Sequence, residues 1–256
     1  MNSAAEAALH LSPAQNTGNE NTSARDRLIV ALDYPDSVSA LAAVDRLSGL
    51  CGWFKVGLEL YLAAGNGIVE TLRRRGFSVF LDLKLHDIPN TVAGAVRSAT
   101  ICGADMLTVH ASGGPAMLAA AAEAASTPHA PKLLAVTVLT SMDQQQLAAT
   151  GVTDPPASQV LRLAQMAWGS GIRGFVASAE ELPALRSHLP KATLVIPGIR
   201  PAGAAIGDQK RVATPAAAIA AGAGFLVVGR PITQAPDPAQ AAEAILGEIA
   251  SAISNP

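Results

Sequence analysis

Three charged residues lie within six positions at the end of a run that otherwise has the composition of a buried strand: Asp82, Lys84 and Asp87. Residues two apart on a strand point to the same face, so Asp82 and Lys84 share one side. A lysine beside two carboxylates is held as an ammonium, which suits proton delivery to a developing carbanion and disfavours a Schiff base. Asp82 would then repel an anionic substrate group. A metal held by the two aspartates with His86 or His110 is an alternative, although the ammonium already fills the cationic position.

Other charged residues lie near the ends of three further apolar runs: Asp33, Lys55 and Arg230. Only 15% of the chain is charged, against about a quarter in typical soluble domains. A structural ion-pair cluster is the alternative interpretation, but burying several charges is costly unless they pair. The pattern therefore favours a site that faces a ligand.

A second group of polar residues lies towards the end of the chain, in PGIRP (197–201), GDQKR (207–211) and VVGRP (227–231). The backbone N–H groups of Gly229 and Arg230, with the guanidinium, are suited to bind a phosphate group. A simple turn before the last helix would also explain GRP. Together with the preceding segment rich in Gly, Arg and Gln, the pattern favours phosphate.

Eight short runs rich in β-branched and apolar residues must position these groups: 27–33, 53–58, 77–83, 105–111, 133–140, 174–179, 193–199 and 225–230. Between them lie stretches with helical spacing, for example 37–50, 59–76 and 214–222. Pro89 and Pro215 suit a first helical turn, and Gly49, Gly76 and Gly222 suit helix ends. Two connections, Thr140 to Gly174 and Gly198 to Phe225, are long enough to cover an active site.

Alternating strands and helices predict a parallel sheet, and eight such units predict a closed (β/α)8 TIM barrel of one domain over residues 25–256. Residues 1–24 are expected to form a flexible tail without the features of a secretory signal. An open, doubly wound sheet is less favoured because ALDYPD follows the first strand where a glycine fingerprint would stand. In a barrel the strand ends share one rim, which would bring the charged residues together.

The composition narrows the function classes. A net charge of −2 and no Lys/Arg-rich run argue against nucleic-acid binding. No apolar segment is long enough to cross a bilayer, so no membrane association is expected. Cys51 and Cys102 lie in apolar surroundings, which argues against a disulfide framework and favours a cytoplasmic protein.

The stretch DLKLHDIPNT (82–91) carries a specific resemblance. With ALD (31–33), FKVG (54–57), AVTVLTSM (135–142), PGIRP and VVGRPIT (227–233), the chain resembles the orotidine 5′-phosphate decarboxylase family of the bacterial type. The resemblance runs from about Arg25 to the last helix. It implies a (β/α)8 barrel enzyme that converts orotidine 5′-monophosphate to uridine 5′-monophosphate and CO2, the last step of de novo UMP biosynthesis. No cofactor and no metal are implied.

Carried over by position, the resemblance makes Lys84 the proton donor to C6 and sets Asp82 against the substrate carboxylate. Lys55 and Asp33 would hold the ribose hydroxyls and complete the charge network. A metal-dependent relative acting on sugar phosphates is an alternative, but such relatives are expected to have a carboxylate where Lys55 stands. A silent phosphate-ligand-binding protein is a further alternative, made less attractive by the intact set of lysines and aspartates.

The resemblance also implies a homodimer with shared active sites. Asp87 and Thr91 would reach into the site of the neighbouring subunit, and Ile88 between them would belong to the substrate-binding residues. The other implied substrate contacts lie after later strands: Thr140 at the pyrimidine, Arg200 and Gln209 in a loop over the phosphate, and Gly229 with Arg230 at the phosphate itself.

Overall fold

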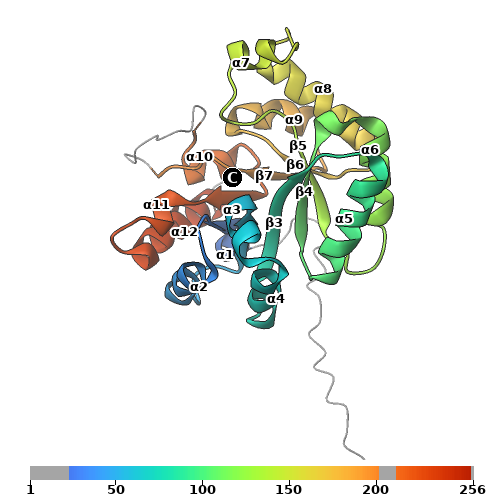
Figure 1. The fold of residues 1–256 in the computed structure, drawn as a ribbon. Helices are drawn as coiled ribbons and strands as arrows, with labels where there is room; N and C mark the ends of the chain where they lie inside the picture. The colour runs from blue at the N-terminus through green and yellow to red at the C-terminus, as the bar shows by residue number, and fades with distance from the viewer. Residues whose placement is uncertain (1–22, 202–211, 255–256) are drawn as a thin grey trace, which may run out of the picture.

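All eight apolar runs form parallel strands in the computed structural model, which describes residues 23–201 and 212–254 (Figure 1). Each strand pairs with its neighbours in chain order, and β8 pairs with β1, so the sheet closes. The predicted (β/α)8 barrel is confirmed and the open sheet is excluded. The strands are β1 Leu28–Leu32, β2 Trp53–Gly57, β3 Ser78–Leu85, β4 Met106–His110, β5 Lys132–Val136, β6 Gly174–Val176, β7 Thr193–Ile196 and β8 Phe225–Val228.

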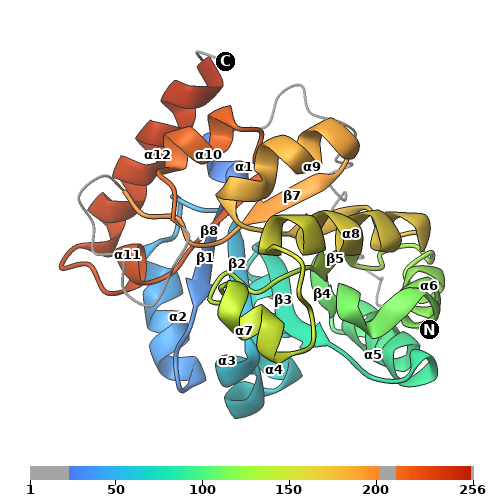
Figure 2. The same ribbon diagram turned by 90° about the horizontal axis from the view of Figure 1, so that it is seen from above.

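Helices surround the strands when the barrel is seen end-on (Figure 2). They are α1 Ala24–Arg27, α2 Ser37–Arg46, α3 Leu58–Ala64, α4 Asn66–Arg74, α5 Pro89–Ile101, α6 Gly114–Ala124, α7 Gln144–Ala149, α8 Pro156–Gly169, α9 Leu182–His188, α10 Pro215–Ala220, α11 Arg230–Thr233 and α12 Pro238–Ser254. Short 3-10 turns η1 (Ala111–Gly113) and η2 (Ala179–Glu181) follow β4 and β6. As predicted, Pro89 and Pro215 open their helices, where a missing N–H costs no helical hydrogen bond.

One predicted helix is divided. The stretch 59–76 forms α3 and α4, which are separated by Gly65 at φ 61° and ψ −155°. Glycine reaches this conformation without the steric penalty that a Cβ atom would bring, so the chain changes direction there. Helical spacing alone does not report such a break, because both halves keep their own apolar positions.

Two apolar cores hold the barrel together. The inner core fills the barrel with Ile29, Ala31, Phe80, Met106, Leu134, Val195, Phe225 and Val227. The outer core joins the opposite faces of the strands to the helices, and on β1 it contains Leu28, Val30 and Leu32. Full burial of each large aliphatic side chain contributes about 1.5–3 kcal/mol before entropy is counted. The inner core therefore forms a rigid floor beneath the rim where the strands end.

Each of the two long connections begins at that rim, where its strand ends. The β5–β6 connection contains α7 and α8, and α7 lies on the side of the barrel where the strands end (Figures 1 and 2). In the β7–β8 connection a parallel bridge joins Ile199 to Ala213. Residues 1–22 of the expected tail lie outside the described residues, and α1 begins at Ala24. The domain limits stay a prediction.

The remaining expectations concern cysteines and membranes. Cys51 and Cys102 are both free and buried, as expected from their apolar surroundings. Within residues 23–201 and 212–254, no helix has the length and apolar character needed to cross a bilayer.

Candidate active site

The end of β3 departs from a regular strand. Leu81 pairs with Leu107 and Leu85 pairs with Val109, so β3 uses four positions where β4 uses two. The additional residues form a bulge, a device that redirects a side chain at a sheet edge. Within it Lys84 has φ 52°, a left-handed conformation that costs a non-glycine residue about 1–2 kcal/mol. Asp82 and Lys84 do meet on one side, with their charged groups 2.8 Å apart, although the bulge interrupts the simple alternation from which this was predicted.

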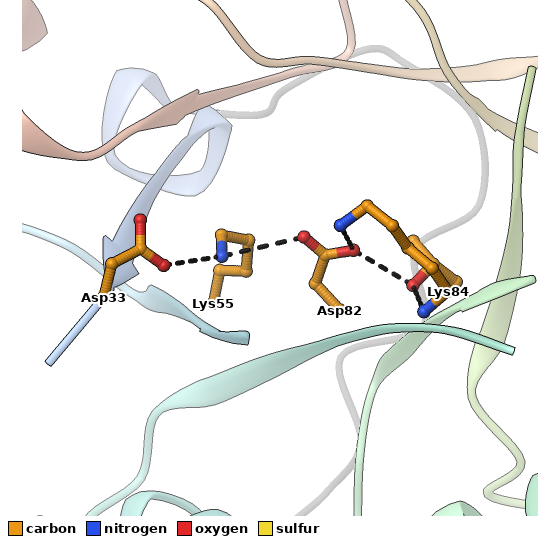
Figure 3. Close-up of polar contacts among 5 residues, drawn as sticks. Asp33, Lys55, Asp82 and Lys84 are labelled. Carbon is orange, nitrogen blue, oxygen red and sulfur yellow. Dashed lines mark hydrogen bonds and ion pairs between the residues drawn. The ribbon is translucent and has the colours of Figure 1, made fainter. Parts of the chain in front are cut away.

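Four charged side chains form a continuous chain across β1, β2 and β3 (Figure 3). The Lys55 ammonium lies 3.0 Å from Asp33 Oδ1 and 3.6 Å from Asp82 Oδ2. The Lys84 ammonium donates to Asp82 Oδ1 at 2.8 Å. Four of the charged residues predicted to converge at the rim are thus brought together, with opposite charges in alternation. Arg230, which was predicted to join them, lies after β8 and is near Arg200 instead.

The charged side chains of Lys55 and Asp82 occupy strand positions that face into the barrel. Lys55 follows Trp53 by two positions, and Asp82 follows Phe80 by two, so each polar residue lies one layer above the inner core. Thr108 stands in the same relation to Met106 on β4. A polar residue two positions after an inner-core residue was the signal that could have identified Thr108, which the sequence analysis missed.

Asp82 is the central group of the chain. Its side chain is only 13% exposed, and the buried Thr108 hydroxyl donates to its Oδ1 at 3.0 Å. Burial by itself raises the pKa of Asp82. The charges of Lys55 and Lys84, with the hydrogen bonds from Lys84 and Thr108, outweigh burial and hold the pKa below its ordinary value. The Asp82 carboxylate is therefore kept ionised at the bottom of the site.

Asp87 lies apart from this chain. It is exposed and accepts a hydrogen bond from its neighbour, the Ile88 N–H, at 2.6 Å. Within the described part of the chain it forms no ion pair with Lys84, so the expected lysine between two carboxylates was wrong for a single subunit. The order is reversed, since the Asp82 carboxylate lies between two ammonium groups. Thr91 lies in the first turn of α5, just after Asp87 in the chain, and both residues are exposed.

Gly57 makes room for the Lys55 ammonium. A Cβ atom at this last residue of β2 would lie 2.9 Å from Lys55 Nζ and 3.3 Å from Asp33 Oδ1. Its φ of −91° is open to any residue, so space and not backbone conformation calls for glycine. Gly57 ends the FKVG stretch, but this spatial role was not predicted from the sequence.

The chain of charges forms one side of a cavity of about 190 Å³. Lys55, Asp82 and Lys84 line that side. The opposite side comes from the later strands and their connections: Val136, Val138, Leu139, Thr140, Val176, Pro197 and Val227. Thr140, predicted from the sequence to contact a ligand, is thus located at the cavity. A small, mostly apolar cavity with a few fixed polar groups is typical of a ligand site.

Two arginines lie near each other after β7 and β8. The backbone N–H of Arg200 donates to the Ala213 carbonyl at 2.9 Å, next to the bridge between Ile199 and Ala213. Burial lowers the pKa of Arg200, and the charge of Arg230 lowers it further. Two neighbouring guanidiniums beside Gly229, the residue before α11, suit an anion. Gln209, assigned to the same group, lies outside the described residues.

The two histidines of the metal alternative pair with each other. The rings of His86 and His110 lie 5.6 Å apart. Burial lowers the pKa of His110, with further lowering from the charges of His86 and Lys84. Among residues 23–201 and 212–254, no group of three or more His, Cys, Asp or Glu side chains is placed to hold a metal ion. The structure therefore does not bring the proposed metal ligands together.

The sequence is similar to that of a family of known enzymes. Residues 26–245 match the family model described as "Orotidine 5′-phosphate decarboxylase / HUMPS family". Among curated proteins, the orotidine 5′-phosphate decarboxylase of Halorhodospira halophila is 55% identical over 228 residues, which are 88% of this chain and 97% of that protein. The enzyme of the same name from Moorella thermoacetica is 52% identical over 234 residues, covering 88% of this chain and 93% of that protein.

A solved structure agrees in fold. The crystal structure of orotidine 5′-phosphate decarboxylase from Lactobacillus acidophilus superimposes with a TM-score of 0.78 at 39% sequence identity. The match covers 88% of this chain and 99% of that one. The similarity therefore extends over the whole barrel and includes every strand that carries a candidate site residue.

Proposed function

The chain belongs to the orotidine 5′-phosphate decarboxylase / HUMPS family, and from this we propose that it decarboxylates orotidine 5′-monophosphate to uridine 5′-monophosphate and CO2. This is the reaction of pyrimidine biosynthesis that its curated relatives are named for. The observation that carries the proposal is the alternating chain Asp33, Lys55, Asp82 and Lys84, of which the last three line one side of the cavity. It provides a carboxylate and an ammonium in contact, with no need for a cofactor.

The mechanism we propose begins with repulsion. The Asp82 carboxylate, held ionised by its two lysines, would lie against the carboxylate of the bound substrate. Two like charges in a poorly solvated site raise the energy of the bound substrate relative to the transition state, in which the departing carboxylate loses its charge. Repulsion of this kind favours loss of CO2.

Proton transfer from Lys84 completes the reaction. The bond between C6 and the carboxylate carbon breaks, CO2 leaves, and the electron pair remains on C6. The Lys84 ammonium, already fixed 2.8 Å from Asp82, is placed to stabilise this charge and to donate a proton that forms the new C–H bond. Its side chain is 31% exposed, so water can return the proton.

Substrate binding is assigned to groups on both sides of the cavity. Lys55 and Asp33 would hold the ribose hydroxyls, and Thr140 at the cavity wall would contact the pyrimidine. Arg200 and Arg230 would bind the phosphate. Gly229 beside them, Ile88 at the rim and Gln209 in the β7–β8 connection complete the proposed set.

The test is direct assay of the purified protein. Absorbance loss of orotidine 5′-monophosphate and formation of uridine 5′-monophosphate are measured before and after dialysis against a strong chelator. Activity that survives dialysis supports the proposal. Failure to consume the substrate contradicts it, and loss of activity restored by Mg²⁺ would favour the metal-dependent sugar-phosphate alternative. That alternative needs a carboxylate where Lys55 stands, and here the ammonium lies between Asp33 and Asp82.

We further propose that two copies of the chain share their sites in a homodimer in the cytoplasm. Asp87, Ile88 and Thr91 are exposed at the rim, and Ile88 is 66% exposed although it is apolar. With no ion pair to Lys84 inside its own subunit, Asp87 is placed to approach the Lys84 of a partner. In a two-fold dimer this contact is reciprocal.

Mixed dimers test the shared site. Lys84→Ala and Asp87→Ala are each expected to be nearly inactive alone. After joint refolding at equal amounts, half of the dimers are mixed, and about a quarter of all sites carry neither defect. Activity should rise to about a quarter of that of the unmodified enzyme. No gain over the average of the two variants, with mixed dimers present, would refute sharing.

A further inference from the structure

We propose that Thr108 is a positioning residue for the decarboxylation: its hydroxyl group holds the Lys84 backbone and the Asp82 carboxylate in the relative placement that proton delivery requires. The inference rests on the proposed function and extends it to a residue outside the charged chain. Thr108 lies on β4, is fully buried, and contacts both groups.

The first contact explains how the bulge is held. Lys84 is in the left-handed conformation between two paired positions of β3, where the regular ladder to β4 is interrupted. Its backbone N–H donates to Thr108 Oγ1 at 2.8 Å. A buried N–H without an acceptor is costly, so the hydroxyl replaces the ladder carbonyl that the bulge has removed. The side chain of β4 thereby stabilises a backbone conformation on β3.

The second contact carries that support to the carboxylate. A threonine hydroxyl has one proton, and because Oγ1 accepts from Lys84 N–H, its own proton is free to be donated. It is donated to Asp82 Oδ1 at 3.0 Å, the same oxygen that receives the Lys84 ammonium at 2.8 Å. Rotation of the carboxylate would break both bonds. The hydroxyl therefore fixes the backbone and the charged partner of Lys84 at once.

The chemistry requires both relations. The ammonium must reach the reacting carbon, and the carboxylate must stay opposite the substrate, with tolerances well below 1 Å. A long, flexible lysine has many rotamers, and a bulged backbone adds more freedom. Thr108 limits both without touching the substrate, so it acts through Asp82 and Lys84.

Two substitutions separate the hydroxyl from the volume of the side chain. Thr108→Val keeps the shape and removes the hydrogen bonds, whereas Thr108→Ser keeps the hydroxyl and removes a methyl group. For Thr108→Val we expect kcat to fall by about 10- to 100-fold, because a shift of about 1 Å at the reacting groups costs that much. Affinity for uridine 5′-monophosphate should stay within about threefold, because binding of the distant phosphate is untouched. Thr108→Ser should recover kcat to within about threefold.

The pH profile gives a readout that loss of packing would not move. The hydrogen bond from Thr108 helps to lower the pKa of Asp82. Its removal should raise that pKa, so the acid limb of the kcat/KM profile should shift to higher pH in Thr108→Val and return in Thr108→Ser. A purely structural defect would lower the rate by the same factor at every pH.

Thr137 provides a matched control. It is a buried threonine just after β5, and its hydroxyl donates at 3.3 Å to the carbonyl of Val176, a residue of the apolar lining, and not to a member of the charged chain. Thr137→Val loses one buried hydrogen bond of similar kind. Its kcat should stay within about twofold of the unmodified enzyme. Equal losses in Thr137→Val and Thr108→Val would overturn the assignment.

Other outcomes are equally decisive. Unchanged kcat in Thr108→Val, or equal losses in the Val and Ser variants, would overturn the proposal. If Thr108→Val does not fold, Thr108→Ala removes the same hydroxyl without branching and takes its place. Crystal structures give an arm that needs no activity: the Lys84–Asp82 contact of 2.8 Å should persist in Thr108→Ser and be lost in Thr108→Val. An unmodified protein that does not decarboxylate orotidine 5′-monophosphate would instead refute the proposed function, and the crystal structures would still decide the role of Thr108.

Discussion

The two sides of the cavity are built from the same architecture and differ in chemistry. The strands β1 to β4 present a polar wall, in which Lys55, Asp82 and Lys84 line the cavity and Asp33 and the buried Thr108 contact them outside the lining. The later strands and their connections present an apolar wall, formed chiefly by Val136, Val138, Leu139, Val176, Pro197 and Val227. The barrel backbone does not determine which residue types stand at these positions, so the two walls differ because their side chains differ.

The two walls have different physical properties. On the polar wall each charge contacts an opposite charge, which fixes its position and offsets part of the cost of burial. The apolar wall excludes water from the other side of the cavity, and in such surroundings charges interact more strongly. On the proposed mechanism, the polar wall would supply the reactive groups and the apolar wall the surroundings of low polarity in which they act.

Removing the Lys84 ammonium should have the largest effect on the polar wall, since it leaves Asp82 with one lysine and, on the proposed mechanism, the reacting carbon with no proton donor. Lys84→Ala should lower kcat/KM by at least about 10³-fold, because the contact matters most as charge develops in the transition state. The measurement is absorbance loss of orotidine 5′-monophosphate.

Lys132 offers a matched control for that variant. It is the first residue of β5, at the opposite end of the barrel, and its ammonium donates to Thr193 Oγ1 at 3.3 Å. Lys132→Ala should retain activity to within about twofold. If Lys84→Ala keeps its fold and turns over substrate at a near-normal rate, Lys84 is not the proton donor.

A smaller loss of activity is expected when Arg230, which follows β8, is replaced. Arg230→Ala removes one guanidinium of the proposed phosphate site, and kcat/KM should fall by about 10²-fold because charge-assisted hydrogen bonds to phosphate are lost. Orotidine lacking the phosphate should react slowly with the unmodified enzyme and should be nearly insensitive to the substitution. Equal losses for both substrates would show that Arg230 acts elsewhere.

The smallest of these effects is expected at Gly57, which leaves space for the Lys55 ammonium. Gly57→Ala places a Cβ atom 2.9 Å from Lys55 Nζ, so the ammonium must move from its contact with Asp33. We expect kcat/KM to fall by about 10-fold, mainly through KM, as ribose contacts weaken. Gly52→Ala, just before the same strand and with no atom within 4 Å of the added Cβ, should be nearly silent. Equal behaviour of the two variants would argue against a spatial role for Gly57.

Much of this arrangement could be predicted from the sequence. Eight strands, their order and the shared rim follow from apolar runs separated by helical stretches, because each signal is local. The convergence of Asp33, Lys55, Asp82 and Lys84 follows once the barrel is assumed. These inferences needed only the side-chain period of a strand and the direction of parallel strands.

The rest depended on three-dimensional contacts. The bulge that places Lys84 has no signature in its own strand, because it arises from a mismatch with β4. Thr108 gains its importance only from that mismatch. Asp87 was expected beside Lys84 from spacing alone, but it lies exposed just before α5 and, among the described residues, forms no ion pair with Lys84. Each miss concerns a relation between segments.

The alternating order of the polar wall has a consequence for how substrate arrives. Two aspartates and two lysines cancel formally, so this wall projects little field into solution beyond the Debye length of about 8 Å at physiological ionic strength. Arg200 and Arg230, at the proposed phosphate site, add positive charge that would attract an anionic nucleotide. Rising ionic strength should slow encounter at the arginines and spare the chemistry among the paired charges. Capture and conversion are thus electrostatically separate, although they occur in one barrel.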